Sequence, residues 1–229
     1  MGFVSGLAAV KEIQDSRPSG DFKERVKATW VSLKAGEEVK LVFLQEIDEG
    51  SPKFSEKNGL AKFFLEHSNP DNWRKSAECT INEGSCYACD QGWRQKTVFY
   101  VNVLVQKGKE DPYVAVLSRG LGKTSIVNTL LKMAGSEDYD LSITDKTFTF
   151  SREGSTKDDT VYTLSNLGKA HSFNVEEFEL FDLEGVPFHV DPSRQENYYT
   201  DGASGGSAKG GAPATPAKPV SASSVDADW

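Results

Sequence analysis

The sequence contains little cysteine, little histidine and no long apolar run, since only three Cys and three His occur among 229 residues. Three cysteines cannot all form disulfides within one chain. Residues 2–10 are too short and too rich in small side chains to serve as the apolar part of a secretory signal. We therefore expect an intracellular, reducing environment. No run approaches the length that spans a membrane, so no membrane partner is expected.

The sequence also lacks an excess of positive charge. Its 34 acidic residues outnumber the 26 Lys and Arg residues, which gives a net charge of −8. This balance argues against indiscriminate electrostatic binding to nucleic acid or anionic lipid. A nucleic-acid site on this chain would have to be a local basic surface, and we expect an acidic face opposite it.

All three cysteines lie in one motif, H-x11-C-x6-C-x2-C, which consists of His67, Cys79, Cys86 and Cys89. A Cys-x-x-Cys pair binds one metal ion through both thiolates, and a third thiolate with one imidazole completes a tetrahedron. Under reducing conditions the pair indicates metal binding or redox chemistry, and its glycine-flanked loop favours metal. We predict a structural zinc site. The alternatives to His67 as the fourth ligand are Asp90, His171 and His189.

The pattern of apolar residues predicts a mainly β protein with minor α-helix. Strand-like β-branched and aromatic residues occupy residues 25–33, 39–47, 97–105 and 113–117. A hairpin is expected over residues 142–150 and 160–164, and a helix over residues 125–134, which Gly135 ends. This order fits an OB-fold-like barrel of five or six antiparallel strands within residues 25–199.

The remaining segments divide the chain further. Residues 51–95 are polar and irregular, and we interpret them as a small zinc-binding insertion that needs metal to become ordered. Residues 1–24 form an N-terminal arm. Residues 200–224 are almost entirely Gly, Ala, Ser, Pro and Thr, which predicts a flexible linker. The chain then ends in an acidic, aromatic-tipped tail, residues 225–229, in which Asp226, Asp228 and Trp229 form a predicted partner-docking peptide.

Two enzymatic motifs are incomplete in this sequence. A phosphate-binding loop requires glycine where Leu117 stands, although the helix start near Lys123 still suits one backbone phosphate. A zinc deaminase requires His-x-Glu and Pro-Cys-x-x-Cys, whereas Asn69 occupies the Glu position and Ser85 precedes Cys86. We therefore predict a protein that is not an enzyme.

Basic residues alternate with aromatic residues on both sides of the metal motif and along the predicted barrel. Proteins that bind single strands combine cations for the phosphates with aromatic rings on which bases stack. Tyr100 is expected to point outward, because it lies on the strand face opposite Phe99 and Val101. The candidate DNA contacts are Trp73, Arg74, Lys75, Trp93, Arg94, Lys96, Tyr100, Arg119, Lys123, Lys146, Phe148 and Arg152.

With these residues the chain resembles the zinc-containing single-stranded-DNA-binding, helix-destabilising proteins of tailed bacteriophages. The resemblance rests on the order of the four metal ligands, on the Arg119…Gly122-Lys123 loop, and on the helix and hairpin that follow. It covers roughly residues 25–190. Both wide gaps of the metal motif are shorter here than in that family. The basic N-terminal arm of that family is only loosely matched in this chain, by Lys11, Arg17, Lys23, Arg25 and Lys27.

The resemblance implies an OB-fold, a structural Zn²⁺ on the four ligands, and a DNA cleft lined by the neighbouring Arg and aromatic residues. It implies a protein that coats and protects single-stranded DNA during replication, recombination and repair, in the bacterial host cytoplasm if the chain is phage-encoded. The tail would recruit a polymerase, helicase or primase. Two other interpretations stay open: a zinc-stabilised protein-interaction adaptor without a nucleic-acid site, and a metal-dependent enzyme that acts on nucleic acid.

Overall fold

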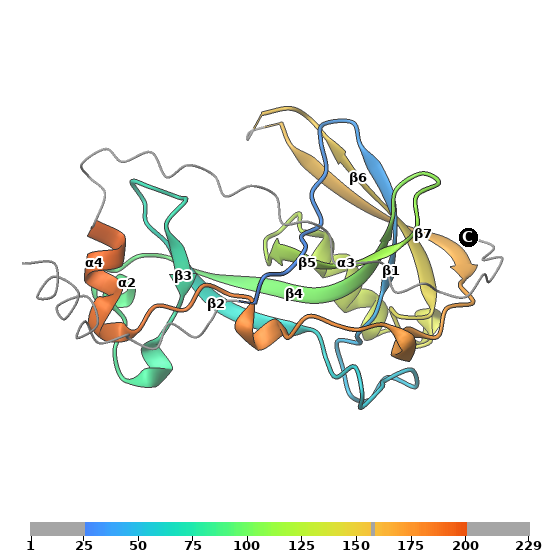
Figure 1. The fold of residues 1–229 in the computed structure, drawn as a ribbon, viewed down its shortest axis with the longest axis horizontal. Helices are drawn as coiled ribbons and strands as arrows, with labels where there is room; N and C mark the ends of the chain where they lie inside the picture. The colour runs from blue at the N-terminus through green and yellow to red at the C-terminus, as the bar shows by residue number, and fades with distance from the viewer. Residues whose placement is uncertain (1–25, 157–158, 201–229) are drawn as a thin grey trace, which may run out of the picture.

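The computed structural model describes residues 26–156 and 159–200 (Figure 1). The predicted N-terminal arm, the linker beyond Thr200 and the tail with Asp226, Asp228 and Trp229 lie outside these residues. The described part is mainly β with minor helix, as the sequence predicts. None of its helices is long and apolar enough to cross a membrane.

One antiparallel sheet contains the seven strands of the described residues. They are β1 (Glu38–Phe43), β2 (Lys62–Ser68), β3 (Ser76–Glu78), β4 (Gln95–Gln106), β5 (Tyr113–Gly120), β6 (Lys146–Glu153) and β7 (Val161–Ala170). The strand order is β3-β2-β4-β1-β6-β7, and β5 pairs with the other edge of β4. The first half of β4 pairs with β2 and its second half with β1. This long strand therefore connects the two ends of the molecule (Figure 1).

The main hydrophobic core lies on one face of β4, and the sequence predicts both this strand and the helix that covers it. The odd-numbered residues of β4, among them Phe99 and Val103, pack against β1, β6 and α3 (Ile126–Ala134). Ser125 caps the helix, because its side chain accepts a hydrogen bond from the N–H of Val127, and Gly135 ends it. The predicted hairpin is β6–β7. Its turn needs Gly154, whose φ is +78° and whose Cβ would lie 2.1 Å from the Asp159 carbonyl oxygen.

Three expectations about the strands are wrong or only partly met. The first predicted strand, residues 25–33, is no strand within its described part, because it meets β5 only at an isolated parallel bridge between Trp30 and Val116. The insertion 51–95 is not irregular throughout, since it contains β2 and β3. The predicted barrel is not closed in the described part of the chain. β5 and β7 do not pair with each other in the described residues, so the sheet is open there, although α3 contacts both strands.

A C-terminal segment, residues 171–200, crosses the outer face of the sheet, and we call it the strap. Its helical turns are η3 (Val175–Glu177), η4 (Leu183–Gly185), η5 (Pro192–Arg194) and α4 (Gln195–Thr200). In Figure 1 it runs in orange from the β7 end to α4, which lies beside α2 (Tyr87–Asp90). It buries the even-numbered residues of β4. At its middle the Asn102 side chain donates to the Phe181 carbonyl oxygen and accepts from the Phe181 N–H, both at 3.0 Å.

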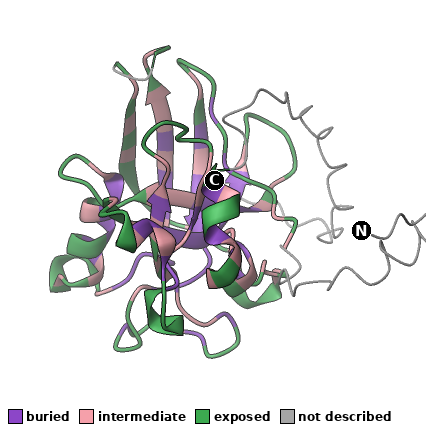
Figure 2. Cartoon of the chain, turned by 90° about the vertical axis from the view of Figure 1, so that its left-hand side faces the viewer, coloured by how far each residue is buried: buried purple, intermediate pink, exposed green. Residues whose placement is uncertain are grey.

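The distribution of burial follows this layering. In Figure 2 the buried residues line the strands of the sheet, while the loops and much of the surrounding helices are exposed. The two remaining turns, η1 (Ile81–Glu83) and η2 (Glu137–Tyr139), contain no buried residue. Two hydrophobic clusters cover the sheet, one on each face: α3 packs on one side and the strap on the other.

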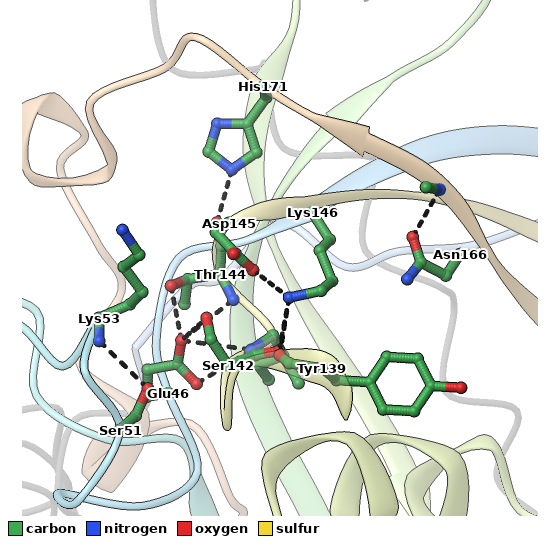
Figure 3. A network of polar contacts seen from close by, with 12 residues as sticks. Glu46, Ser51, Lys53, Tyr139, Ser142, Thr144, Asp145, Lys146, Asn166 and His171 are labelled. Carbon is green, nitrogen blue, oxygen red and sulfur yellow. Dashed lines mark hydrogen bonds and ion pairs between the residues drawn. The ribbon is translucent and has the colours of Figure 1, made fainter. Parts of the chain in front are cut away.

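A buried carboxylate fixes the chain just before β6 (Figure 3). Glu46 accepts hydrogen bonds from the hydroxyls of Ser142 and Thr144, both at 2.6 Å, and from the N–H groups of Ile143 and Thr144. Next to it Lys146 donates to the carbonyl oxygen of Tyr139. These bonds satisfy a charge that would otherwise be costly to bury.

Candidate metal centre and nucleic-acid surface

The four predicted metal ligands lie together. The candidate ligand atoms of His67, Cys79, Cys86 and Cys89 are all within 4.8 Å of one another. The sulfur of Cys79 lies 3.8 Å from that of Cys86 and 3.6 Å from that of Cys89, and Nε2 of His67 lies 3.3 Å from the Cys89 sulfur. All three cysteines are free. The clustering predicted from the motif is confirmed, and none of Asp90, His171 and His189 belongs to this group.

The spacing of these atoms fits one tetrahedral ion. Zn–S bonds of about 2.3 Å and a Zn–N bond of about 2.0–2.1 Å place the ligand atoms of a tetrahedron roughly 3.5–3.8 Å apart. Two of the three short distances, 3.6 and 3.8 Å, lie in that range, the third, 3.3 Å, is slightly shorter, and all four ligand atoms lie within 4.8 Å of one another. Three sulfurs and one imidazole nitrogen form a closed set without a position for substrate, which is typical of a structural site.

Burial and the neighbouring sulfurs set the pKa values in the cluster. Burial raises the pKa of the Cys86 thiol, but the backbone of Cys89 and Thr80 and the adjacent thiols outweigh that effect, so its pKa lies below the ordinary value. Burial and the two neighbouring sulfurs raise the pKa of Cys89 to about 12. Burial lowers the pKa of His67, which keeps the imidazole neutral. A bound divalent ion would deprotonate the thiols and use the neutral ring as a ligand.

Residues outside the motif hold the centre in place. We define the metal lobe as residues 76–94 and 188–200, whose apolar members pack around the cysteines. Gln95 donates to the Cys79 sulfur at 3.2 Å. The buried Gln195 of α4 donates to the Thr80 hydroxyl at 2.8 Å and accepts from the N–H of Tyr87 at 2.9 Å. Hydrogen bonds from residues that do not bind the metal themselves orient the ligands around it. The lobe therefore includes the end of the strap as well as the last part of the predicted insertion.

The metal centre shares one face of β2 with two exposed apolar side chains. Because side chains alternate along a strand, Phe63, Leu65 and His67 point to the same face. Phe63 is 40% exposed, and its ring centre lies 5.0 Å from that of Phe99 on β4. Arg119 of β5 is the cross-strand partner of Phe99 on the other side. The side chains of His67, Phe63, Phe99 and Arg119 therefore lie on one face of the sheet, which extends from the metal centre across β4 to β5.

Arg119 lies in a stack of aromatic and cationic side chains. Its guanidinium carbon is 4.1 Å from the ring centre of Tyr162 on β7 and 5.1 Å from that of Phe150 on β6. The two rings stack with 5.6 Å between centres and 11° between planes. Arg152 lies 6.0 Å from the Tyr162 ring. Cation–π contacts of this kind hold a guanidinium flat against a ring.

Neither arginine has an acidic partner among the described residues. Arg119 donates to the Ser118 carbonyl oxygen, and Arg152 to that of Leu33. The Nε atoms of both side chains are buried and have no hydrogen-bond partner in the described part of the chain. Burial lowers the pKa of Arg119, and the nearby Arg152 cation adds to this effect. Two neighbouring guanidinium groups without a carboxylate favour an anionic ligand.

The other predicted DNA contacts lie in several places. Lys123 is exposed before α3, and Arg94 and Lys96 are exposed at the start of β4, where Lys96 donates to the Ser68 hydroxyl. Trp73 is 70% exposed at the tip of the β2–β3 hairpin, where Arg74 packs over its ring. The next residue of this hairpin, Lys75, is half-buried and donates to the carbonyl oxygen of Tyr198.

Four of the predicted DNA-contact residues are engaged in packing or hydrogen bonds within the protein. The outward exposure expected for Tyr100 is wrong: only 5% of it is accessible, because the strap covers that face of β4. Phe148 is fully buried against Phe43, so it offers no ring to a base. Lys146 donates to Asp145 and to two carbonyl oxygens (Figure 3). Trp93 packs between Tyr87 and Tyr199 in the metal lobe.

Sequence reasoning missed three residues of this face. The predicted contacts do not include Phe63 and Leu65, because the sequence predicts an irregular insertion where β2 lies. Tyr162 was missed because nothing in its local sequence marks it as a neighbour of Arg119. We call the face formed by these residues together with Arg119, Arg152 and the exposed Leu121 the Arg119 surface. The period-two alternation in residues 62–68 could have revealed the first two.

Five exposed acidic residues lie along the strap, on the opposite face. In the strap, Val175, Phe178 and Leu180 point toward β1 and β4, while the carboxylates between them are exposed. These carboxylates belong to Glu176, Glu177, Glu179, Asp182 and Glu184. They lie over the even-numbered side of β4, whereas the Arg119 surface continues the odd-numbered side. These five carboxylates supply part of the net charge of −8 on the side away from the Arg119 surface.

Comparison of this chain with protein-family models, with curated proteins and with solved structures finds no match.

Proposed function

We propose that this protein binds single-stranded DNA without regard to sequence, with no enzymatic activity of its own. The observation that carries the proposal is the Arg119–Tyr162–Arg152 stack, which combines two guanidinium groups with an aromatic ring and includes no carboxylate among the described residues. Single-strand binders need cations for phosphates and rings for bases. Phe63 and Leu65 extend the stack with apolar surface on which further bases can lie.

The order of the strands supports an OB-type barrel as the scaffold of this site. The path β5-β4-β1-β6-β7, with α3 between β5 and β6, has the strand order and helix position of that fold. In a closed barrel the two ends of the path would pair. Here they meet through the side chains of Arg119 and Tyr162. We infer that DNA binds where this barrel is open.

In this proposal the metal centre has a structural task, and the ion is zinc. The ion would be held by His67, Cys79, Cys86 and Cys89 and would cross-link β2 to the metal lobe. Because Phe63 and Leu65 lie on the same face of β2 as His67, the ion would position the floor of the Arg119 surface. The closed ligand set favours this task over a metal-dependent enzyme.

The sequence adds a second part to the proposal. The protein would coat and protect single strands during replication, recombination and repair, and would recruit a partner through its tail. Asp226, Asp228 and Trp229 would make the contact. Deletion of residues 225–229 is expected to preserve DNA binding and to abolish capture of a replication polymerase, helicase or primase in a pull-down assay.

A fluorescence titration with oligo-dT tests the central claim. The full chain is expected to bind oligo-dT at low salt, to lose affinity steeply as salt increases, and to bind duplex DNA of the same length much more weakly. Absence of binding to oligo-dT, or equal affinity for duplex, would refute the proposal. In that case the zinc-stabilised adaptor becomes the better interpretation.

A further inference from the structure

A pocket on the opposite face of β2 has no task in the proposed function. Its volume is about 320 Å³, and it lies between the β2–β3 hairpin, β4 and the strap. It is lined by Glu66, Arg74, Ser76, Tyr100, Phe188 and Tyr198. Ligand pockets begin at about this size, and a single nucleobase requires less room. Because side chains alternate along β2, Glu66 points away from the face that holds Phe63, Leu65 and His67.

The polar groups of the pocket are arranged around one carboxylate. Glu66 accepts hydrogen bonds from the Tyr100 hydroxyl on one oxygen and from the Ser76 hydroxyl, at 3.4 Å, on the other. No Lys, Arg or His of the described residues forms an ion pair with it. A carboxylate accepts about four hydrogen bonds, so both oxygens can accept more from a ligand.

Aromatic and cationic side chains complete the pocket. The rings of Phe188 and Tyr198 lie 5.1 Å apart at 47° on the strap side, and the Lys75 ammonium lies 5.6 Å from the Tyr198 ring centre. On the sheet side the buried Tyr100 contributes the hydroxyl that donates to Glu66. Arg74 is exposed on the hairpin that borders the pocket. Aromatic side chains beside a carboxylate suit a nucleobase, the carboxylate suits a ligand with N–H donors, and the guanidinium suits a phosphate. A cationic peptide side chain would match the carboxylate but would be repelled by Arg74.

We propose that this pocket binds a guanine nucleotide, with the base against Glu66 and the phosphate at Arg74. Guanine presents N1–H and an N2 amino group side by side, and the two oxygens of one carboxylate match that pair. Thymine offers one N–H between two carbonyl oxygens, which a carboxylate repels. The protein would therefore have a base-selective site in addition to the Arg119 surface, which in the proposed function binds DNA independently of sequence. This site lies on the opposite face from the Arg119 surface, so the inference goes beyond the proposed function and can succeed or fail independently of it.

Calorimetric titration of the full chain with dGMP and dTMP tests this inference. We expect dGMP to bind about tenfold more tightly than dTMP, within the range that a bidentate side-chain–base contact provides. In the Glu66→Gln variant this preference should disappear, because an amide nitrogen replaces one acceptor oxygen, while oligo-dT affinity should stay unchanged. Tyr162→Ala should have the reverse effect, with weaker oligo-dT binding and unchanged dGMP binding.

A second variant covers the case in which Glu66→Gln does not fold. Arg74 is exposed, so Arg74→Ala should keep the thermal stability and metal content of the native chain but bind dGMP about tenfold more weakly. Equal affinities for dGMP and dTMP in the native chain would overturn the proposal. So would a guanine preference that survives Glu66→Gln, or binding of an arginine-rich peptide in place of dGMP.

Discussion

The guanidinium carbon of Arg119 lies 4.1 Å from the ring centre of Tyr162, and this contact connects β5 to β7 where the described residues form no ladder between them. A pair of side chains thus occupies the position at which a closed barrel would have backbone hydrogen bonds. Side chains can separate to admit a ligand at lower cost than a strand pair, because no buried N–H or C=O is left unpaired. The proposed DNA site follows from this arrangement.

Replacement of Tyr162 by alanine should weaken binding to oligo-dT by about 1–3 kcal/mol, the usual value of one base–aromatic stack. Tyr162→Phe keeps the ring and should keep most of the affinity. Fluorescence titration at constant salt measures both variants. Equal affinity of the native chain and Tyr162→Ala would remove Tyr162 from the site.

Replacement of Arg119 by alanine should change the salt dependence as well as the affinity. Loss of one phosphate contact lowers the slope of log K against log salt by about 0.7 for a single strand. Lys132→Ala is the matched control, because Lys132 is an exposed cation on α3 outside the Arg119 surface. An unchanged slope in Arg119→Ala, or an equal change in the control, would contradict the assignment.

Removal of the metal should loosen one end of the molecule. The full chain is expected to release about one equivalent of zinc to a strong chelator, because the four ligands form one closed site. Hydrogen exchange should then accelerate in the metal lobe and stay slow in β1 and β6, whose pairing does not involve the centre. Collapse of protection throughout the sheet would show that the metal supports the whole fold.

Glu46 should make a large contribution to stability. In Glu46→Gln an NH₂ group faces donors of the Ser142–Thr144 segment, so buried donors lose their acceptor and the free energy of unfolding should fall by about 2–3 kcal/mol. Glu49→Gln is the control, because Glu49 is exposed three residues later. Chemical denaturation measures both variants. A loss below about 0.5 kcal/mol for Glu46→Gln would contradict this role.

Asn102 should hold the strap to the sheet. In Asn102→Ala the N–H and carbonyl oxygen of Phe181 lose their buried partner, and we expect a loss of about 2–3 kcal/mol in the free energy of unfolding. Asn197→Ala, at an exposed position of α4, should have little effect. The same denaturation assay compares them, and equal losses in the two variants would show that the strap does not depend on this contact.

The strongest sequence patterns predicted local structure well. Residues 97–105 are mostly apolar and rich in β-branched side chains, with Asn102 as the polar exception inside the run, and they form most of β4. Ser125 and Gly135 mark the two ends of α3 correctly. The metal ligands were predictable because three thiols and an imidazole at this spacing have few other uses. In each case the information lies within a short stretch of chain.

The misplaced residues depend on contacts between distant segments. Tyr100 was expected in solvent because the sequence reveals one core, whereas the strap adds a second layer from residues about 80 positions later. The proximity of Arg119 to Tyr162 depends on how β5 and β7 curve around α3, which no local pattern encodes. The mainly β class and the clustering of the four candidate metal ligands were therefore predictable, but the composition of the Arg119 surface was not.

The hydrogen bond between Gln195 and Thr80 joins residues 115 positions apart. The metal lobe therefore cannot be completed until nearly all of the described chain has been synthesised, although its four ligands are available much earlier. Contacts of such long sequence separation tend to form late in folding, because closing the long loop between them costs conformational entropy before the contact stabilises the fold. A nascent chain would bind its metal with an open side, and α4 would close that side last. Fragments that end before residue 188 should accordingly exchange their metal faster than the full chain.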